Sequence, residues 1–377
     1  MNGVALLSDL SRAFHPDADP RNVAMIRRRH GYWNELARLR GWDLSLVDAE
    51  TAEGAGGRVC WIDLPMVPRR RYREIFARAV ALGAESVSQH PDEVESVLGL
   101  DRFYPVLAGA GVPTPRTAFV PVDEELAAAI DSPSAVRALL TEHIYGALFD
   151  AGLDPHQGVY VRGYDSSAKS ANPEHYFGDN QADLEATTFE VIRRLRSALD
   201  VGGLALREHL DLERIELPAA QGARGGARLP FEVRLSVLGR RALMASYHGP
   251  FEALTEEAQQ ELGAALRARD ARVREALGAL TPTLLAADLP ESYVADIAFP
   301  RDREAVVLEL NPLYAAGHNV PVAHALLVAA LGAALVRRAD GAARSWEQVR
   351  GDAAALVGER VEGAAGVWLF DPLPSPP

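Results

Sequence analysis

The sequence is poor in cysteine, holds no long apolar run, and has no excess of positive charge. Cys60 is the one cysteine among 377 residues, which excludes an internal disulfide and a zinc site built from several cysteines, so we expect it to fill the core. The most apolar stretch, 325–336, is too short to cross a bilayer and predicts a buried helix. Acidic residues outnumber basic ones by 52 to 39, which excludes a protein that coats nucleic acid through general positive charge.

Lysine is nearly absent as well. Lys169 is the only one, so 39 − 1 = 38 of the basic residues are arginines. An ammonium point charge is a common phosphate ligand that a planar guanidinium does not imitate, which favours a functional role for this position. Chance survival of a single lysine is the alternative.

Targeting signals and nucleic-acid patches are not evident in the sequence. Residues 1–14 lack the basic start and apolar run of a secretory signal, and with the lone cysteine this favours a cytoplasmic protein. The short arginine runs at 27–29 and 69–71 lie in an acidic chain, and we interpret them as solvated faces.

The first hundred residues alternate short apolar runs with amphipathic stretches. We expect strands at 3–8, 43–47, 58–64 and 85–89, with helices at 24–40 and 72–82. This order predicts βαβ units and a parallel sheet covered by helices. No phosphate-binding glycine fingerprint follows the first strand, so a dinucleotide site there is not expected.

A Val-Pro-Thr-Pro segment at 112–115 forces extended backbone and predicts a domain junction. The helices expected beyond this region or leading into it are 92–111, 124–130, 134–148, 185–199, 256–277 and 320–338. The expected strands, apart from the two hairpins below, are 117–120, 159–162 and 204–210. We interpret the Gly/Ala/Arg-rich segment 221–228 as a mobile loop and the proline-rich end, 372–377, as a disordered tail.

The most informative segment is a hairpin near the C-terminal third of the chain. Strand-like runs at 294–299 and 305–310 flank a polar turn, which places residue 296 opposite 308 or 309. Alternation then brings Asp296, Glu309 and Asn311 to one face. Two carboxylates and an amide oxygen are ligands that suit Mg²⁺. The alternative is the solvated polar side of a half-buried hairpin.

A second hairpin precedes it. Residues 231–237 alternate apolar and polar, Gly239-Arg240 makes the turn, and 242–247 returns. Glu232 and Arg234 therefore point the same way. On a sheet that faces a ligand they would contact sugar hydroxyls and phosphate, whereas on a solvated sheet they would form a weak surface ion pair.

The only lysine lies in a loop that follows a strand ending at Arg162. Ser166 and Ser167 precede Lys169 in this loop, whose backbone N–H groups are of the kind that cradles phosphates. The loop approaches the P-loop pattern but lacks its second glycine. Pro173 also interrupts the helix that a P-loop lysine begins, so we reject that interpretation.

Together these segments resemble the ATP-grasp superfamily. The segments that carry the resemblance, in chain order, are 101–107, 110–117, the Arg162 and Lys169 loop, the adenine-hinge-like 206–210, Asp296, and the Glu-x-Asn-Pro run at 309–312. No single motif is specific, whereas the ordered set covers most of the chain. One departure is that the family usually carries lysine where this chain has Arg162, and often another upstream. Either Arg162 and Lys169 jointly replace them, or phosphate handling is weakened.

The resemblance implies roles for individual residues. Those implied to hold Mg²⁺ are Asp296, Glu309 and Asn311. Those implied to bind ATP are Arg162, Ser166, Ser167, Lys169, Glu208, His209, Leu210 and Glu232. Of these, 208–210 would meet adenine, and Glu232 would approach the ribose or the metal. The catalytic candidates are Arg234, on the transferred phosphate, and Lys169.

The resemblance also implies a fold of mixed α/β and α+β class. An N-terminal βαβ domain on the substrate side (1–100) would precede a two-lobed ATP-grasp domain with antiparallel sheets. The small lobe would span 101–203 and the large lobe, with the metal site, 204–345. A C-terminal extension and tail would form 346–377.

The implied activity is an ADP-forming, ATP- and Mg²⁺-dependent ligase that joins a carboxylate to an amine through an acyl phosphate. Its partners would be a small-molecule or peptide carboxylate and an amine nucleophile, with no nucleic acid and no membrane; a homodimer stays open. His248, Gly249, His318 and Asn319 are candidate substrate contacts, each histidine having a loop residue without a role as its alternative. A small-molecule kinase on the same fold and a non-catalytic ATP-binding protein are the competing functions.

Overall fold

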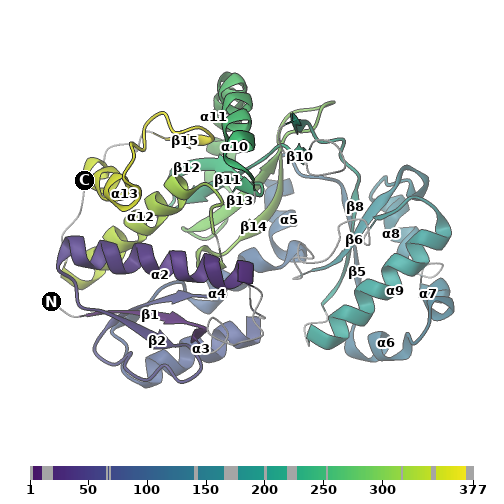
Figure 1. Ribbon diagram of the computed structural model, residues 1–377. Helices are drawn as coiled ribbons and strands as arrows, with labels where there is room; N and C mark the ends of the chain where they lie inside the picture. Colours follow the sequence, from purple (N-terminus) through teal and green to yellow (C-terminus); the bar gives the residue numbers. More distant parts are fainter. Residues whose placement is uncertain are drawn as a thin grey trace.

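The described part of the chain forms a parallel sheet of four strands, antiparallel sheets of four and five strands, and a two-stranded ribbon (Figure 1). This computed structural model describes residues 3–10, 20–64, 67, 69–139, 143–164, 177–198, 202–218, 227–251, 254–315, 317–340 and 345–370. The predicted mixture of α/β and α+β architecture is confirmed by the pairing of its strands.

The N-terminal sheet is parallel in the order β2-β1-β3-β4, as the βαβ pattern predicts. Its strands are β1 (Val4–Ser8), β2 (Leu44–Asp48), β3 (Val59–Asp63) and β4 (Ser86–Val87). Its helices are α2 (Pro20–Arg40), α3 (Arg69–Ala81) and α4 (Pro91–Leu98). Strands β1 and β3 are buried along their whole length, which explains why they are continuously apolar rather than alternating. Cys60 lies buried in β3, as expected.

We call the second sheet, which is antiparallel in the order β5-β8-β6-β7 and drawn at the right of Figure 1, the small lobe; it includes β8, although the sequence analysis placed residues from 204 onwards in the large lobe. Its strands are β5 (Thr117–Pro121), β6 (Val159–Gly163), β7 (Phe177–Gly178) and β8 (Gly203–Glu208). Its helices are α6 (Glu124–Ala129), α7 (Pro133–Leu139), α8 (Tyr145–Asp150) and α9 (Gln181–Ala198), with a 3₁₀ turn at Pro155–Gln157. Val159, Val161, Leu204 and Leu206 pack into the helix-side core. Alternation therefore turns Arg162 and Arg207 to the opposite face.

The large lobe is an antiparallel sheet in the order β14-β13-β11-β12-β15. Its strands are β11 (Glu232–Val237), β12 (Ala242–Tyr247), β13 (Tyr293–Ala298), β14 (Val306–Asn311) and β15 (Val367–Leu369). The remaining elements are α5 (Leu100–Gly109), β9 (Arg214–Leu217), β10 (Ala227–Pro230), α10 (Glu256–Ala268), α11 (Asp270–Ala286), a 3₁₀ turn at Leu313–Ala315, α12 (Pro321–Asp340) and α13 (Trp346–Val357). The apolar helix α12 is buried as predicted and packs against α2 and α13. None of the helices within the described ranges could cross a membrane.

Two stretches predicted as single helices are each divided in two. The 92–111 stretch breaks at Gly99, whose extended backbone (φ −89°, ψ 122°) separates α4 from α5. The 256–277 stretch breaks at Arg269, which lies between α10 and α11 and whose guanidinium donates to Ala265 O and to Glu213. In the 134–148 stretch the structure describes α7 and α8, and 140–142 lie outside the described residues.

Several short strands were not predicted, and one of them, β15, is completed by a distant partner. β15 lies beside β12, so part of the C-terminal extension completes the large-lobe sheet. β9 and β10 form a ribbon, and residues 227–228 of the predicted mobile loop belong to β10. The rest of that loop, 221–226, and the tail at 372–377 lie outside the described residues.

Candidate functional site

The predicted hairpin has the register that its polar turn implies. Asp296 on β13 lies directly opposite Glu309 on β14, and a bulge follows at Ile297. The Nδ2 of Asn311 donates to Asp296 Oδ2 at 3.1 Å. Asp296, Glu309 and Asn311 are 1, 7 and 5% exposed, so the three oxygen-bearing side chains form a buried cluster and not the solvated side of a hairpin.

Arg234 joins this cluster from the neighbouring strand, where it pairs in register with Asp296. Its guanidinium donates to both carboxylate oxygens of Asp296, at 2.7 and 2.8 Å, and to Gly317 O at 2.7 Å. The Nε2 of His248 lies 3.3 Å from Arg234 Nη2, at the edge of the same group. Burial alone lowers the pKa of Arg234, but the Asp296 carboxylate more than offsets this, and the pKa is raised.

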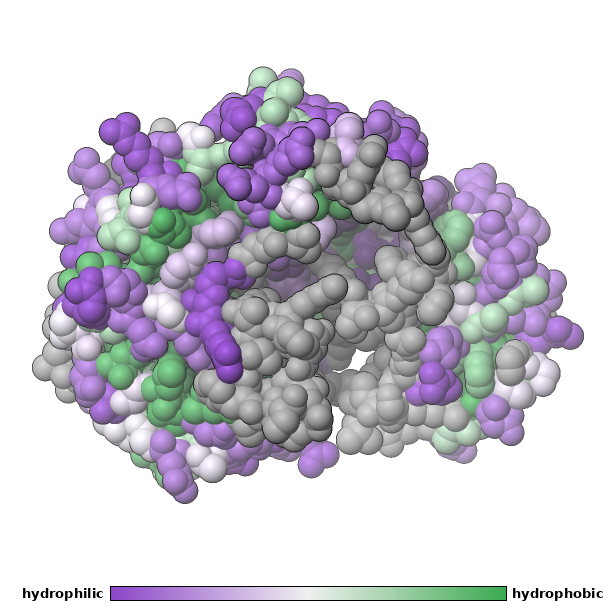
Figure 2. Space-filling view, in the orientation of Figure 1, coloured by the Kyte–Doolittle hydropathy of each residue, from purple (hydrophilic) through white to green (hydrophobic). Residues whose placement is uncertain are grey.

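The small lobe reaches the cluster through two arginines. Arg162 Nη2 lies 3.3 Å from Glu309 Oε1, with both side chains largely buried. Arg207 donates to Leu308 O at 3.0 Å and also to the hydroxyl of Tyr104. Glu309 is thus approached from the sheet of the opposite lobe. Hydrophilic residues cover much of the outer surface of both lobes on the face that Figure 2 shows.

We call the group formed by Arg162, Arg207, Arg234, Asp296, Glu309 and Asn311 the interlobe site. Among the described residues, no three His, Cys, Asp or Glu side chains gather as a metal site, and this group offers two carboxylates with one amide. That donor set fits Mg²⁺, which takes one or two protein carboxylates and completes its shell with water and phosphate oxygens.

His318 does not reach the site as a substrate contact. It is buried, and its Nε2 and Nδ1 lie 2.7 and 2.6 Å from the hydroxyls of Ser236 and Ser246. Burial, with the nearby Arg234 and His248, holds the pKa of His318 well below its ordinary value, so the ring stays neutral. The candidate role in substrate binding is therefore replaced by a structural one, which fixes the 317–320 segment against β11 and β12.

In the adenine-hinge-like segment, 206–210, the side chain of Glu208 is hydrogen-bonded to other residues of the protein. The Glu208 carboxylate accepts from Arg116 N at 2.9 Å, from Arg116 Nε at 3.0 Å and from Arg303 Nη1 at 2.8 Å. Burial opposes ionisation, but these donors hold the pKa of Glu208 below its usual range. Glu208 therefore ties β5 and the 300–304 turn to the hinge, and a nucleotide contact here would use the backbone.

His209 and Leu210 sit in different surroundings. The His209 ring lies 5.8 and 5.1 Å from the rings of Tyr160 and Phe177. Leu210 is buried against Ala298 and neighbouring apolar residues of the large lobe. An aromatic cluster and the buried Leu210 thus lie at the 208–210 segment, and aromatic and apolar side chains of this kind can pack against the faces of a nucleobase.

The other predicted positions lie around this group or outside the described residues. Glu232 is two residues before Arg234 on β11, and the field of its charge acts on Arg234 and Arg207. A side chain at Gly249 would collide with the Tyr247 hydroxyl, so this glycine permits close packing. Asn319 is half-buried before α12. Lys169, Ser166 and Ser167 lie outside the described residues.

The sequence did not reveal that the N-terminal sheet supports the site. Arg29, interpreted as part of a solvated face, is buried, ion-paired with Asp63 and hydrogen-bonded to Tyr314 O, and burial lowers its pKa to about 10. Gln89 accepts from Leu313 N at 2.7 Å and donates to Ser292 O at 2.8 Å. Both residues therefore anchor the chain that follows Asn311.

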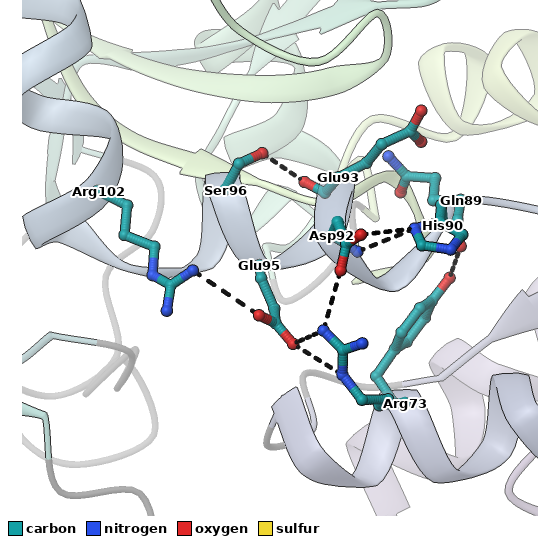
Figure 3. Close-up of polar contacts among 9 residues, drawn as sticks. Arg73, Gln89, His90, Asp92, Glu93, Glu95, Ser96 and Arg102 are labelled. Atoms are coloured by element: carbon teal, nitrogen blue, oxygen red, sulfur yellow. Dashed lines mark hydrogen bonds and ion pairs between the residues drawn. The ribbon is translucent and has the colours of Figure 1, made fainter.

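Figure 3 shows Gln89 and the polar contacts of the residues around it. It immediately precedes α4, whose first turn is capped by the His90 side chain. Arg73 of α3 pairs with Asp92 and Glu95 of α4, and Arg102 lies 3.7 Å from the same Glu95 (Figure 3). This network joins α3, α4 and α5 beside Gln89, whose own side chain makes the contacts with Leu313 N and Ser292 O.

Comparison with known proteins gives likenesses of fold. No family model matches the chain, and no curated protein matches it by sequence. The structure of D-cycloserine synthetase DcsG is 16% identical, with 88% of this chain and 99% of that one covered at a TM-score of 0.48. A RimK domain ATP-grasp protein from Sphaerobacter thermophilus is 15% identical, covering 83 and 91% at a TM-score of 0.46.

A third structure, ATP-grasp ligase PsnB with a minimal precursor, is 14% identical and covers 95% of this chain and 99% of its own at a TM-score of 0.40.

Proposed function

We propose that this chain is a divergent ATP-grasp enzyme, an ATP- and Mg²⁺-dependent ligase that joins a carboxylate to an amine or related nucleophile. The observation that carries the proposal is the interlobe site itself. Buried carboxylates on adjacent strands, Asp296 and Glu309, meet guanidinium groups that come from both lobes. Opposite charges of this kind, concentrated between two lobes, suit a metal-bound polyphosphate.

Asp296, Glu309 and Asn311 would hold Mg²⁺ through their side-chain oxygens. When bound, the metal neutralises phosphate charge and orients the phosphoryl group. Because both Asp296 oxygens accept from Arg234 in the ligand-free chain, Arg234 would release at least one of them. The freed guanidinium lies where it can donate to the transferred phosphate.

Arg162 and Lys169 would bind the phosphates of ATP from the small lobe, with Ser166 and Ser167 in the same loop. The hinge at 208–210 would receive adenine through its backbone, with the Tyr160, Phe177 and His209 rings beside it. Glu232 would approach the ribose or the metal. The work of the protein is then positioning and charge neutralisation, since phosphoryl transfer asks for little covalent chemistry from side chains.

The reaction balances in two steps. A carboxylate oxygen attacks the γ-phosphorus of ATP, which forms an acyl phosphate and releases ADP. An amine then attacks the acyl carbon, and phosphate leaves while the proton passes to solvent. The carboxylate and the amine would belong to a small molecule or a peptide, and the chain would act in the cytoplasm.

Thermal melting with ATP, Mg²⁺, both or neither tests the site first. A ligand at about 100 times its dissociation constant stabilises by roughly 2.7 kcal/mol, which is a shift of a few degrees. We expect a Mg²⁺-dependent ATP shift that Glu309→Gln loses. Asp288→Asn, which removes an exposed carboxylate of the same lobe, serves as the matched control and should keep the shift. No shift at millimolar ATP would refute the proposal.

Hydroxylamine trapping tests the chemistry. With a panel of carboxylates, ATP-dependent formation of an acyl hydroxamate together with ADP supports the acyl phosphate. A stable phosphorylated product with no hydroxamate would instead identify a small-molecule kinase. Nucleotide binding without turnover of any panel member would favour an ATP-binding protein.

A further inference from the structure

Among the residues that the structure describes, Arg207 has no ion-pair partner although it is buried. It lies on β8, is 9% exposed, and faces the large lobe. Its contacts are neutral: Nη2 donates to the Tyr104 hydroxyl and to Leu308 O, and the guanidinium carbon lies 5.4 Å from the centre of the Tyr104 ring. Within the described part of the chain, no carboxylate pairs with it and its buried Nε has no hydrogen-bond partner.

The other two guanidinium groups of the interlobe site are compensated. Arg234 pairs with Asp296, and Arg162 pairs with Glu309. Burying a charge without a counterion is costly, and a donor left unsatisfied adds to that cost. Burial accordingly lowers the pKa of Arg207, and the charge of Arg162 lowers it further, although Tyr104 and the carboxylates of Glu309 and Glu232 act in the opposite direction. An unpaired buried guanidinium beside a second cation is an arrangement that an anion would stabilise.

The sheet register explains why these two arginines are neighbours. Tyr160 of β6 lies opposite Arg207, and Arg162 lies opposite Ala205, two residues along β8. Arg162 and Arg207 therefore occupy diagonal positions on the same face, within reach of one another's long side chains. Both face the strand of Glu309 across the lobes.

We propose that Arg207 is a phosphate-binding residue, which with Arg162 forms a pair of guanidinium groups around the polyphosphate of the nucleotide. The inference rests on the proposed function and deepens it. A phosphate oxygen would satisfy Nε and offset the mutual repulsion of the two cations, whereas a neutral nucleobase would satisfy only the donor. In a chain with a single lysine, a second arginine supplies the charge that this face needs.

Calorimetric titration of adenosine, AMP and ADP, each with Mg²⁺, tests the assignment. We expect Arg207→Met to weaken ADP at least tenfold and to leave adenosine unchanged, since a charged hydrogen bond is lost only with the phosphates. Arg207→Lys should fall between Met and the native chain. Arg193→Gln, which removes an exposed arginine of the same lobe, is the matched control and should bind ADP like the native chain.

Melting of the ligand-free variants gives a second readout. Because Arg207 has no counterion, Arg207→Met should melt within about two degrees of the native chain or above it, and Tyr104 keeps its own bond to Leu308 O at 3.0 Å. Unchanged ADP affinity in both variants, or an equal loss for adenosine and ADP, would overturn the assignment. If the native chain itself binds no nucleotide, the proposed function fails instead.

Discussion

Arg234 and Asp296 form a bidentate ion pair across the centre of the large-lobe sheet, with Nε 2.7 Å from Oδ1 and Nη2 2.8 Å from Oδ2. Both side chains are less than a tenth exposed. The two residues are opposite one another in the register of β11 and β13, so the pair is built by the sheet and not by a loop. The strongest candidate metal ligand is thus held by a cation until a ligand competes for it.

This pair predicts an asymmetric response to mutation. Asp296→Leu leaves the Arg234 guanidinium buried without its counterion, and we expect a loss of about 3–5 kcal/mol in the free energy of unfolding. The double variant Arg234→Met with Asp296→Leu removes both charges and should recover most of that loss. Urea denaturation of the native chain, both single variants and the double variant completes the cycle.

The coupling free energy between Arg234 and Asp296 is the quantity that tests this prediction. Additive single losses would show that the guanidinium and carboxylate do not compensate each other in solution. A double variant that is as unstable as the worse single variant would show that the two groups are coupled, but it would contradict the predicted recovery of stability.

Local pattern was enough to place the hairpin ligands. The polar turn at 300–304 and the alternation of β14 predict that Asp296 faces Glu309, and the pairing confirms it. The turn at Gly239-Arg240 is also confirmed, with both residues at φ 58°, the left-handed values of a type I′ turn. The register of a hairpin and the type of a short turn depend on nearby residues, so they can be predicted from a single sequence.

Burial by distant elements could not be predicted in this way. Arg29 belongs to an arginine run that local pattern assigns to solvent, yet it pairs with Asp63 beneath the loop of Tyr314. His318 follows the ligand strand closely, yet both ring nitrogens are taken by serines of β11 and β12. These outcomes depend on how the N-terminal sheet and the large lobe pack together, which periodicity does not encode.

Three buried histidines make stability depend on pH. Burial, with the neighbouring Arg29, lowers the pKa of His30 to about 4, and the pKa values of His318 and His324 lie well below 6.5. Below pH 6.5 the unfolded chain binds protons that the native chain excludes. The free energy of unfolding therefore falls as pH falls, by up to about 1.4 kcal/mol per pH unit for each such proton.

Urea denaturation at pH 7.5, 6.5 and 5.5 measures this slope. His30→Gln should reduce it by one proton while its amide keeps a hydrogen-bonding group near Ser8. His156→Gln, at an exposed turn, controls for the replacement of a histidine by glutamine. An unchanged slope in His30→Gln would show that His30 protonates equally in both states.

Two helical glycines should respond in opposite directions to alanine. A Cβ at Gly332 of α12 would lie 2.7 Å from Leu36 Cδ2 and 2.9 Å from Trp42 Cη2, so α12 and the N-terminal unit would have to separate. We expect Gly332→Ala to cost about 1–3 kcal/mol. Nothing lies within 4 Å of a Cβ at Gly278 in α11, so Gly278→Ala should stabilise by about 0.5–1 kcal/mol. Thermal melts that shift in the same direction would contradict this packing.

Gln89 couples the N-terminal sheet to the metal-ligand strand. Its side chain accepts from Leu313 N and donates to Ser292 O, so it holds the residue that follows Asn311-Pro312 and the residue that precedes β13. Gln89→Met leaves both backbone groups without that partner, and we expect a loss of about 1–3 kcal/mol. Because the two ends of the ligand hairpin would loosen, Mg²⁺-dependent ATP binding should weaken as well.

Gln259→Met separates these two effects. Gln259 also bonds backbone carbonyls, at 3.1 Å to Phe251 O and 3.2 Å to Leu254 O, but these lie at the start of α10 and away from the interlobe site. It should lower stability without changing the dissociation constant for Mg²⁺-ATP, whereas Gln89→Met should change both. Equal dissociation constants in the two variants would mean that the hairpin keeps its ligand geometry without Gln89, since β11 and β14 already hold β13 from both sides.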